Sequence, residues 1–255
     1  MENSITFLGT GTSSGIPMIG CDCEVCKSPD SKDKRLRTSA YIQYEGLKLV
    51  IDCGPDFRQQ MLRENISYLD AILLTHQHKD HTGGLDDVRS FNYFQKKSFP
   101  IYAETRVQDS LKKEYYYAFE EHPYPGTPLY DIHTIDETPF EIKGHKIIPI
   151  RAIHYKLPIL GYRFGDLAYI TDANFIPEES MAKLAGVKVL ILSCIRRTKH
   201  IAHFSLGEAL EVMDKIGAER NYLTHLSHQL ERCTLLDKAL PDNIHPAYDG
   251  LNIKF

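Results

Sequence analysis

The sequence predicts a layered α/β protein in which β-sheets are covered by helices. Short apolar runs bounded by turn residues recur along the whole chain, as expected for buried strands. Patterns typical of amphipathic helices lie between these runs. The 255 residues, 42% hydrophobic and 25% charged, suffice to bury a large core without disulfide bonds. We therefore expect one domain over residues 1–255.

The predicted strands and helices alternate along the chain. Expected strands, several of which end in an acidic, hydroxyl or histidine residue, are 5–8, 48–52, 70–75, 147–153, 167–171, 187–193 and 221–224. Expected helices cover 56–64, 106–121, 177–184 and 205–216. The last helix has the clearest ends, because Ser205 and Glu208 form a capping-box pattern and Gly217 follows the final apolar residue.

Residues 91–130 are unusually aromatic, with 11 of the 26 Tyr and Phe side chains of the chain. We interpret this segment as helices that pack on a sheet. A lid that stacks on a substrate and a contact surface of a homodimer are the alternatives.

Charge and hydropathy narrow the expected partners. The net charge of -4 provides no overall positive field, which argues against a nucleic-acid partner. The first residues lack the basic and apolar regions of a signal peptide, and no run approaches the roughly 18 apolar residues of a membrane span. We expect a cytoplasmic protein that does not contact a membrane.

Four potential metal ligands occupy six residues directly after the apolar run 71–74. His76 and His78 alternate as at the end of a strand, and Asp80 and His81 are expected in a tight loop that leads to a helix. Solubility alone does not explain such a cluster. The spacing allows the four side chains to converge on more than one metal ion.

Three further residues at expected strand ends complete such a site. His154, Asp172 and His225 each close a short apolar run. Imidazole and carboxylate ligands suit zinc, manganese or iron.

This order of ligands resembles that of the metallo-β-lactamase superfamily, whose fold is a four-layer αββα sandwich. The resemblance spans nearly the whole chain. It implies a dinuclear site with His76, His78 and His154 on one ion, Asp80, His81 and His225 on the other, and Asp172 between them. It also implies that Asp52 supports the metal-binding loop by hydrogen bonding. Two Mn²⁺ or Zn²⁺ ions are the expected catalytic cofactors.

A second metal site is indicated by three cysteines within six residues, Cys21, Cys23 and Cys26. Reduced thiols favour a metal site over disulfides. Together with His228, the cluster resembles the structural zinc site of PhnP-like proteins, the cyclic-phosphate phosphodiesterases of the carbon-phosphorus lyase pathway. The resemblance implies one structural Zn²⁺ held by these four residues. A redox role is the alternative.

His203 precedes the helix expected at 205–216. The same placement occurs in the phosphodiesterase branch of the superfamily, which implies that His203 is the general acid. His200 is the competing candidate. Asp80 is also a candidate catalytic residue, mainly as a ligand of the metal ions. Arg196 and Arg197 are candidates for phosphate contacts, with a solvated loop as the alternative.

We expect hydrolysis of a small or cyclic phosphodiester by a hydroxide bound to two metal ions. The main rival is a ribonuclease Z-like tRNA 3′-processing endonuclease, but no long basic arm is evident. A glyoxalase-type thioester hydrolase would leave His203 and the cysteines unexplained. A non-catalytic metal-binding module would not need seven filled ligand positions.

Overall fold

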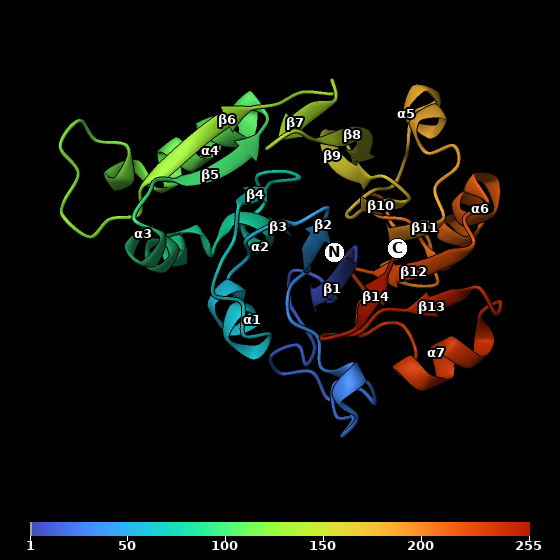
Figure 1. Ribbon diagram of the computed structural model, residues 1–255. Coiled ribbons are helices and arrows are strands. Elements are labelled where there is room, and N and C mark those ends of the chain that lie inside the picture. Colours follow the sequence, from blue (N-terminus) through green and yellow to red (C-terminus); the bar gives the residue numbers. More distant parts are fainter. Residues whose placement is uncertain (1) are drawn as a thin grey trace.

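The computed structural model describes residues 2–255. Two seven-stranded sheets pack face to face, and helices cover the outer face of each (Figure 1). Helices α1 to α4 lie on one side of the pair of sheets and α5 to α7 on the other. The predicted αββα sandwich is confirmed.

The first sheet has the strand order β14-β1-β2-β3-β4-β5-β6. Its strands are β1 (Ser4–Gly9), β2 (Ser39–Tyr44), β3 (Leu47–Ile51), β4 (Ala71–Leu73), β5 (Phe99–Ala103), β6 (Tyr130–Thr134) and β14 (Asn252–Lys254). The covering helices are α1 (Phe57–Arg63), α2 (Lys79–Thr82), α3 (Arg89–Gln95) and α4 (Thr105–Glu114), with short 3₁₀ turns η1 (Ser31–Asp33), η2 (Leu85–Val88) and η3 (Tyr116–Ala118). Strands β3 to β6 run parallel to one another, so their carboxyl ends meet at one edge.

The second sheet has the strand order β13-β12-β11-β10-β9-β8-β7. Its strands are β7 (Phe140–Ile142), β8 (His145–His154), β9 (Leu157–Phe164), β10 (Leu167–Ile170), β11 (Val189–Ser193), β12 (Arg220–Thr224) and β13 (Ile244–Pro246). The covering helices are α5 (Glu178–Lys183), α6 (Leu206–Ile216) and α7 (Cys233–Ala239). Strands β10 to β13 are parallel, which brings the ends of β10 and β12 to the same edge.

Three apolar layers hold the sandwich together. Side chains such as Phe7, Tyr162 and Tyr169 fill the space between the sheets. Separate clusters lie under α1 to α4 and under α5 to α7. Burial on this scale is the main term that stabilises the fold.

All seven predicted strands lie within observed strands or overlap them, but one predicted helix is too long. The helix expected at 106–121 ends at Glu114, where the buried Tyr115 donates a hydrogen bond to the carbonyl of Thr82 (2.7 Å). This contact fixes Tyr115 outside the helix, and a 3₁₀ turn follows.

The aromatic segment 91–130 divides into two parts. Phe91, Phe99 and Tyr115 are buried beneath the first sheet, as expected for helices that pack on it. Tyr93 and Phe94 remain exposed on α3. The homodimer surface stays a prediction.

Among residues 2–255, we find no helix with the length and apolar character needed to cross a bilayer.

Candidate metal-binding active site

Three histidines from the two sheets meet at one edge of the sandwich. His76 and His78 follow β4, and His154 is the last residue of β8. One nitrogen of each ring lies within 4.8 Å of the others, and Nε2 of His76 is 3.0 Å from Nδ1 of His78. His76 and His154 are buried while His78 is exposed, so this group could hold a metal ion that remains open to solvent.

Neighbouring oxygens fix the orientation of two of these rings. Nδ1 of His154 donates to the backbone carbonyl of Ala202 (2.7 Å), and Nδ1 of His76 is 2.9 Å from the hydroxyl of Thr75. A carbonyl can only accept, so the proton of His154 is on Nδ1 and its Nε2 is left as the ligand atom.

A second group contains two carboxylates. Asp80, Asp172 and His225 have ligand atoms within 4.8 Å of one another. A further group of the same kind joins His76, His81 and Asp172. Asp172 therefore belongs to both sides of the site, as a bridging ligand would.

The nitrogens of His81 and His225 that face Asp172 fit a cation. Nε2 of His81 lies 3.3 Å from an oxygen of Asp80 and of Asp172, yet it has no hydrogen-bond partner among the described residues. Nδ1 of His225 lies 3.0 Å from Asp172 and likewise has no hydrogen-bond partner within residues 2–255. Buried nitrogens that face carboxylates without bonding to them suit a shared metal ion.

The electrostatics of the site agree with this arrangement. Burial, with like-charged rings nearby, lowers the pKa of His76 well below its usual value, so the ring is neutral and can bind a metal. Burial alone would raise the pKa of Asp172, but the imidazoles of His225 and His81 hold it well below its usual value.

Asp52, one residue after β3, contacts the loop that carries the histidines. Its carboxylate accepts hydrogen bonds from the backbone N–H and the hydroxyl of Thr75, both at 2.8 Å. It also lies 2.6 Å from Nδ1 of His81, which leaves Nε2 of His81 directed at the metal group. These contacts fit the expected role of Asp52, which is to support the candidate ligands by hydrogen bonding.

Three buried residues of the site have a left-handed backbone. The φ angle is 62° at Asp52, 60° at Asp172 and 55° at His225. Each residue directly follows a parallel strand or comes two residues after it. Non-glycine residues enter this region at an energetic cost, and such residues cluster at functional sites.

Two local expectations are wrong. Strand β4 ends at Leu73, so His76 and His78 lie in a loop rather than at a strand end, and Asp80 and His81 belong to the helix α2 itself. The strand stops early because Thr75 leaves the ladder: its N–H donates to Asp52, and its carbonyl accepts from Leu160 in the other sheet (3.1 Å).

His203, rather than His200, adjoins the metal groups. Its ring centroid is 4.6 Å from that of His154 and 5.0 Å from that of His225. The centroid of His200 lies 5.1 Å from that of His203. Burial, followed by the nearby His225, lowers the pKa of His203 to about 3.

The two candidate phosphate-binding arginines are engaged elsewhere. Arg196 donates to the carbonyls of Thr198 and Lys199, and Arg197 forms an ion pair with Glu231. The sequence did not predict the hydrogen bonds from Arg196 to the loop carbonyls or the one from His154 to the carbonyl of Ala202. Every residue has a backbone carbonyl, so such contacts cannot be read from residue types.

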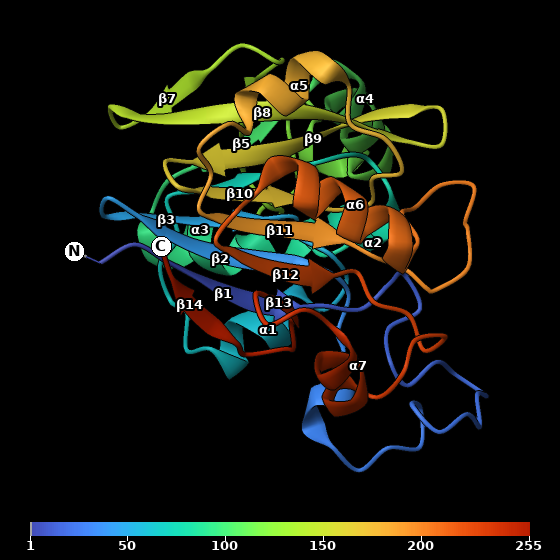
Figure 2. The same cartoon turned by 90° about the vertical axis from the view of Figure 1, so that its right-hand side faces the viewer.

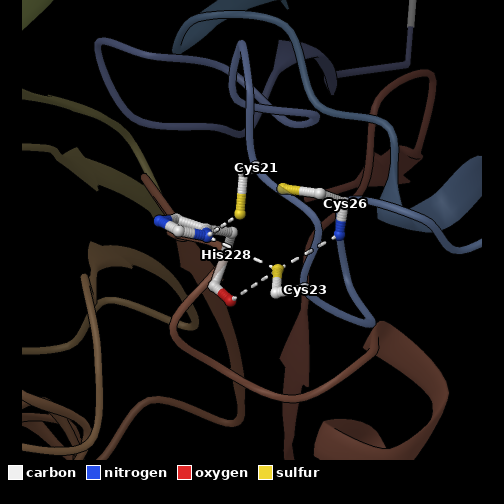
Figure 3. A group of neighbouring side chains, drawn as sticks. All are labelled: Cys21, Cys23, Cys26 and His228. Carbon is white, nitrogen blue, oxygen red and sulfur yellow. Dashed lines mark hydrogen bonds between the residues drawn. The ribbon is translucent and has the colours of Figure 1, made fainter.

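The cysteine cluster forms a second group, shown in Figure 3. Cys21, Cys23, Cys26 and His228 have ligand atoms within 4.8 Å of one another. Nδ1 of His228 is 3.2 Å from the sulfur of Cys21 and 3.5 Å from that of Cys23. The N–H of Cys26 is the main cause that lowers the pKa of Cys23 to about 6. Three sulfurs and one imidazole fit a closed tetrahedral zinc site.

Comparison with known proteins agrees with the fold and the site. A model of the beta-lactamase superfamily domain matches residues 48–226. A solved structure described as a new diphosphatase from the PhnP family is 41% identical, with a TM-score of 0.93, and the match covers 100% of this chain and 98% of that one. Zn²⁺-bound PqqB from Methylobacterium extorquens is 18% identical with a TM-score of 0.81, covers 99% and 100% of the two chains, and shares the fold.

One relative is a longer protein. An octanoyltransferase of Porphyromonas gingivalis is 42% identical over 248 residues, which are 96% of this chain and 50% of that protein. The chain therefore spans about half the length of this relative.

The chain belongs to the metallo-β-lactamase superfamily. Within that superfamily it belongs to the PhnP family.

Proposed function

We propose that the protein hydrolyses a small or cyclic phosphodiester. The observation that carries this proposal is the position of His203, which is buried beside both metal groups with an Nδ1 that lacks a partner within residues 2–255. A phosphodiester expels an alkoxide, which needs a proton. A thiolate needs none, so a thioester hydrolase gives no reason for this histidine.

In this proposal His76, His78 and His154 hold one divalent ion, Asp80, His81 and His225 hold another, and Asp172 contacts both. When bound, two Mn²⁺ or Zn²⁺ ions lower the pKa of water and offset the charge of the phosphoryl oxygens. Cys21, Cys23, Cys26 and His228 hold one structural Zn²⁺. The proposed setting is the cytoplasm, where these thiols stay reduced.

His203 is the proposed proton donor for the leaving group. His203 is neutral in the free protein, since its pKa is lowered to about 3. A phosphodiester anion beside the ring favours the charged imidazolium and raises the pKa of His203. Substrate binding therefore promotes protonation of the general acid. The imidazolium, which has taken up a proton from solvent, then gives that proton to the leaving oxygen. Asp80 acts mainly as a ligand.

The test combines metal analysis with a substrate panel. We expect three metal ions per wild-type chain, and two in Cys23→Ser. The panel contains bis(p-nitrophenyl) phosphate, 2′,3′-cyclic nucleotides, a nucleoside diphosphate sugar, precursor tRNA and S-lactoylglutathione. We expect turnover of the small diesters.

Three results would contradict the proposal. Preferred cleavage of precursor tRNA would favour a ribonuclease Z-like endonuclease, and preferred cleavage of S-lactoylglutathione a thioesterase. No turnover with both catalytic metal positions filled would favour a non-catalytic metal-binding module. The nucleoside diphosphate sugar is included because the PhnP-family relative is described as a diphosphatase.

A further inference from the structure

The segment 195–204 joins β11 to α6 and carries both His200 and His203. Figure 2 shows it as the orange loop on the same side as the blue loop that follows β1. Its two ends are held together, because the N–H of Ile195 donates to the carbonyl of Phe204 (3.1 Å) and the N–H of Leu206 donates to the carbonyl of Arg196 (2.8 Å).

Apolar packing does little to fix the middle of this loop. Arg197, Thr198 and Lys199 are exposed, and Ile201 is 69% exposed. A loop with few buried apolar contacts opens easily unless hydrogen bonds hold it.

Arg196 supplies three hydrogen bonds of this kind. Its Nε donates to the carbonyl of Thr198 (3.2 Å) and its Nη2 to the carbonyl of Lys199 (2.8 Å). Its Nη1 donates to the side-chain oxygen of Gln229 (3.4 Å). One guanidinium therefore joins the start of the loop, its middle and a separate segment.

That separate segment connects the two metal groups. Residues 225–229 include His225 of the catalytic group and His228 of the cysteine group. Ser227 anchors the segment to the same loop, with its N–H (3.2 Å) and hydroxyl (2.6 Å) both donating to the carbonyl of Ile195. The far side of the loop reaches His154 through the carbonyl of Ala202.

We propose that Arg196 is a positioning residue that holds His203 where it can protonate the leaving group. This inference rests on the proposed phosphodiesterase activity. Arg196 does not touch the phosphate in this account. Lysine cannot replace it fully, because a single ammonium cannot reach three acceptors in a planar fork.

The experiment compares two leaving groups. One substrate is an alkyl diester from the panel above that the wild type hydrolyses, such as a 2′,3′-cyclic nucleotide. The other is bis(p-nitrophenyl) phosphate, whose aryloxide leaves without protonation. In His203→Ala we expect kcat for the alkyl diester to fall roughly 100-fold or more and that for the aryl diester to change little.

Arg196→Ala is expected to copy this pattern more weakly, with about a 10-fold loss on the alkyl diester alone, since it acts through His203. Arg196→Lys should recover part of the loss. The double variant Arg196→Ala, His203→Ala should be no slower than His203→Ala. Arg89→Ala is the control, because Arg89 is an exposed arginine at the start of α3 that pairs with Asp86 and belongs to neither the loop nor the metal groups, and it should behave as wild type.

Equal losses on both substrates in Arg196→Ala would show a general structural role and overturn the inference, as would additive losses in the double variant. Metal content and thermal unfolding are measured for each variant, and the inference requires both to stay at wild-type values. A wild type that hydrolyses no diester at all would refute the proposed function itself, and this inference with it.

Discussion

The carboxylate of Asp52 decides which nitrogen of His81 faces the metal group. Nδ1 of His81 is 2.6 Å from Asp52, so the proton on that nitrogen is directed at the carboxylate. Burial alone would lower the pKa of His81, but the surrounding carboxylates, with Asp172 the strongest, raise it well above its usual value. The metal-free ring is therefore an imidazolium: Nδ1 keeps its proton toward Asp52, and a cation bound at the site would displace the proton of Nε2.

Asp52→Asn should therefore weaken the catalytic metal site without changing its shape. The amide can accept from the N–H of Thr75, but its NH₂ group then faces Nδ1 of His81, which favours a proton on Nε2 and blocks ligation. We expect metal affinity at this site to fall by about 10–100-fold, measured by competition with a chelator. Asp56→Asn is the matched control, since the carboxylate of Asp56 accepts hydrogen bonds from Arg37, which is outside the metal groups. Unchanged affinity in Asp52→Asn would refute this role.

Helix α6 begins with a complete capping box. The N–H of Ser205 donates to the carboxylate of Glu208 (2.9 Å), and the Ser205 hydroxyl accepts from the N–H of Glu208 (3.5 Å). Gly217 ends the helix with a left-handed backbone (φ 70°). Both ends are those predicted from the sequence.

Two substitutions in α6 should change stability in opposite directions. Ser205→Ala removes the cap and should lower the free energy of unfolding by about 1 kcal/mol. Gly207→Ala should raise it by about 0.5–1 kcal/mol, because the exposed Gly207 has no heavy atom within 4 Å of a new Cβ. Urea unfolding with metals bound measures both. A loss of stability in Gly207→Ala would contradict this account of the helix.

The sequence predicts elements whose signals are local. The capping box, the Gly217 stop and the apolar run of β11 all lie within a few residues of the element they define. Strand β6 was missed because its sequence, Tyr130–Thr134, is half polar and its pairing partner β5 is distant in the chain. The early end of α4 was missed for a similar reason: the contact of Tyr115 with Thr82 is tertiary.

The two sheets are joined by polar contacts as well as by the apolar layer. The hydroxyl of Tyr162 in β9 donates to the carbonyl of Leu74, just after β4 (2.6 Å). Lys143, in the turn before β8, forms an ion pair with Asp70, which precedes β4. The buried Asp70 also accepts from the N–H of Lys48 (2.9 Å) and the hydroxyl of Tyr68 (3.0 Å).

The Asp70 contacts make stability depend on pH. Burial raises the pKa of Asp70, but Lys143 and the other donors outweigh it and lower the pKa below its usual value. The contribution is therefore present above the unfolded-state pKa of about 4 and is lost as pH falls through the lower folded-state pKa. Asp70 raises the pKa of Lys143, so the pair also weakens at strongly alkaline pH.

Asp70→Asn should cost about 1 kcal/mol of unfolding free energy at pH 7, and the difference from wild type should shrink near pH 3. Denaturant unfolding at both pH values measures this. Tyr68→Phe is the control for Asp70→Asn, because it removes a single hydrogen bond to the carboxylate of Asp70 and keeps the carboxylate itself. A difference that does not depend on pH would refute the assignment to this carboxylate.

The site was predictable to the extent that its residues stand at strand ends. His154, Asp172 and His225 come from distant parts of the chain, but each follows an apolar run, and parallel strands bring their ends together. The strand order was not predictable, because it depends on pairings such as β1 with β14, far apart in sequence. The loop contacts of Arg196 and Ala202 were not predictable either, since they depend on that order.

Two requirements conflict at the left-handed positions Asp52, Asp172 and His225. The backbone conformation favours glycine, whereas the site needs a carboxylate or an imidazole. Glycine would adopt this backbone without strain but would remove the side chain that the site needs. Asparagine tolerates the conformation and lacks the charge or the ring. Stability alone would thus favour residues that the proposed chemistry forbids, so these positions accept a permanent cost in folding to keep their present side chains.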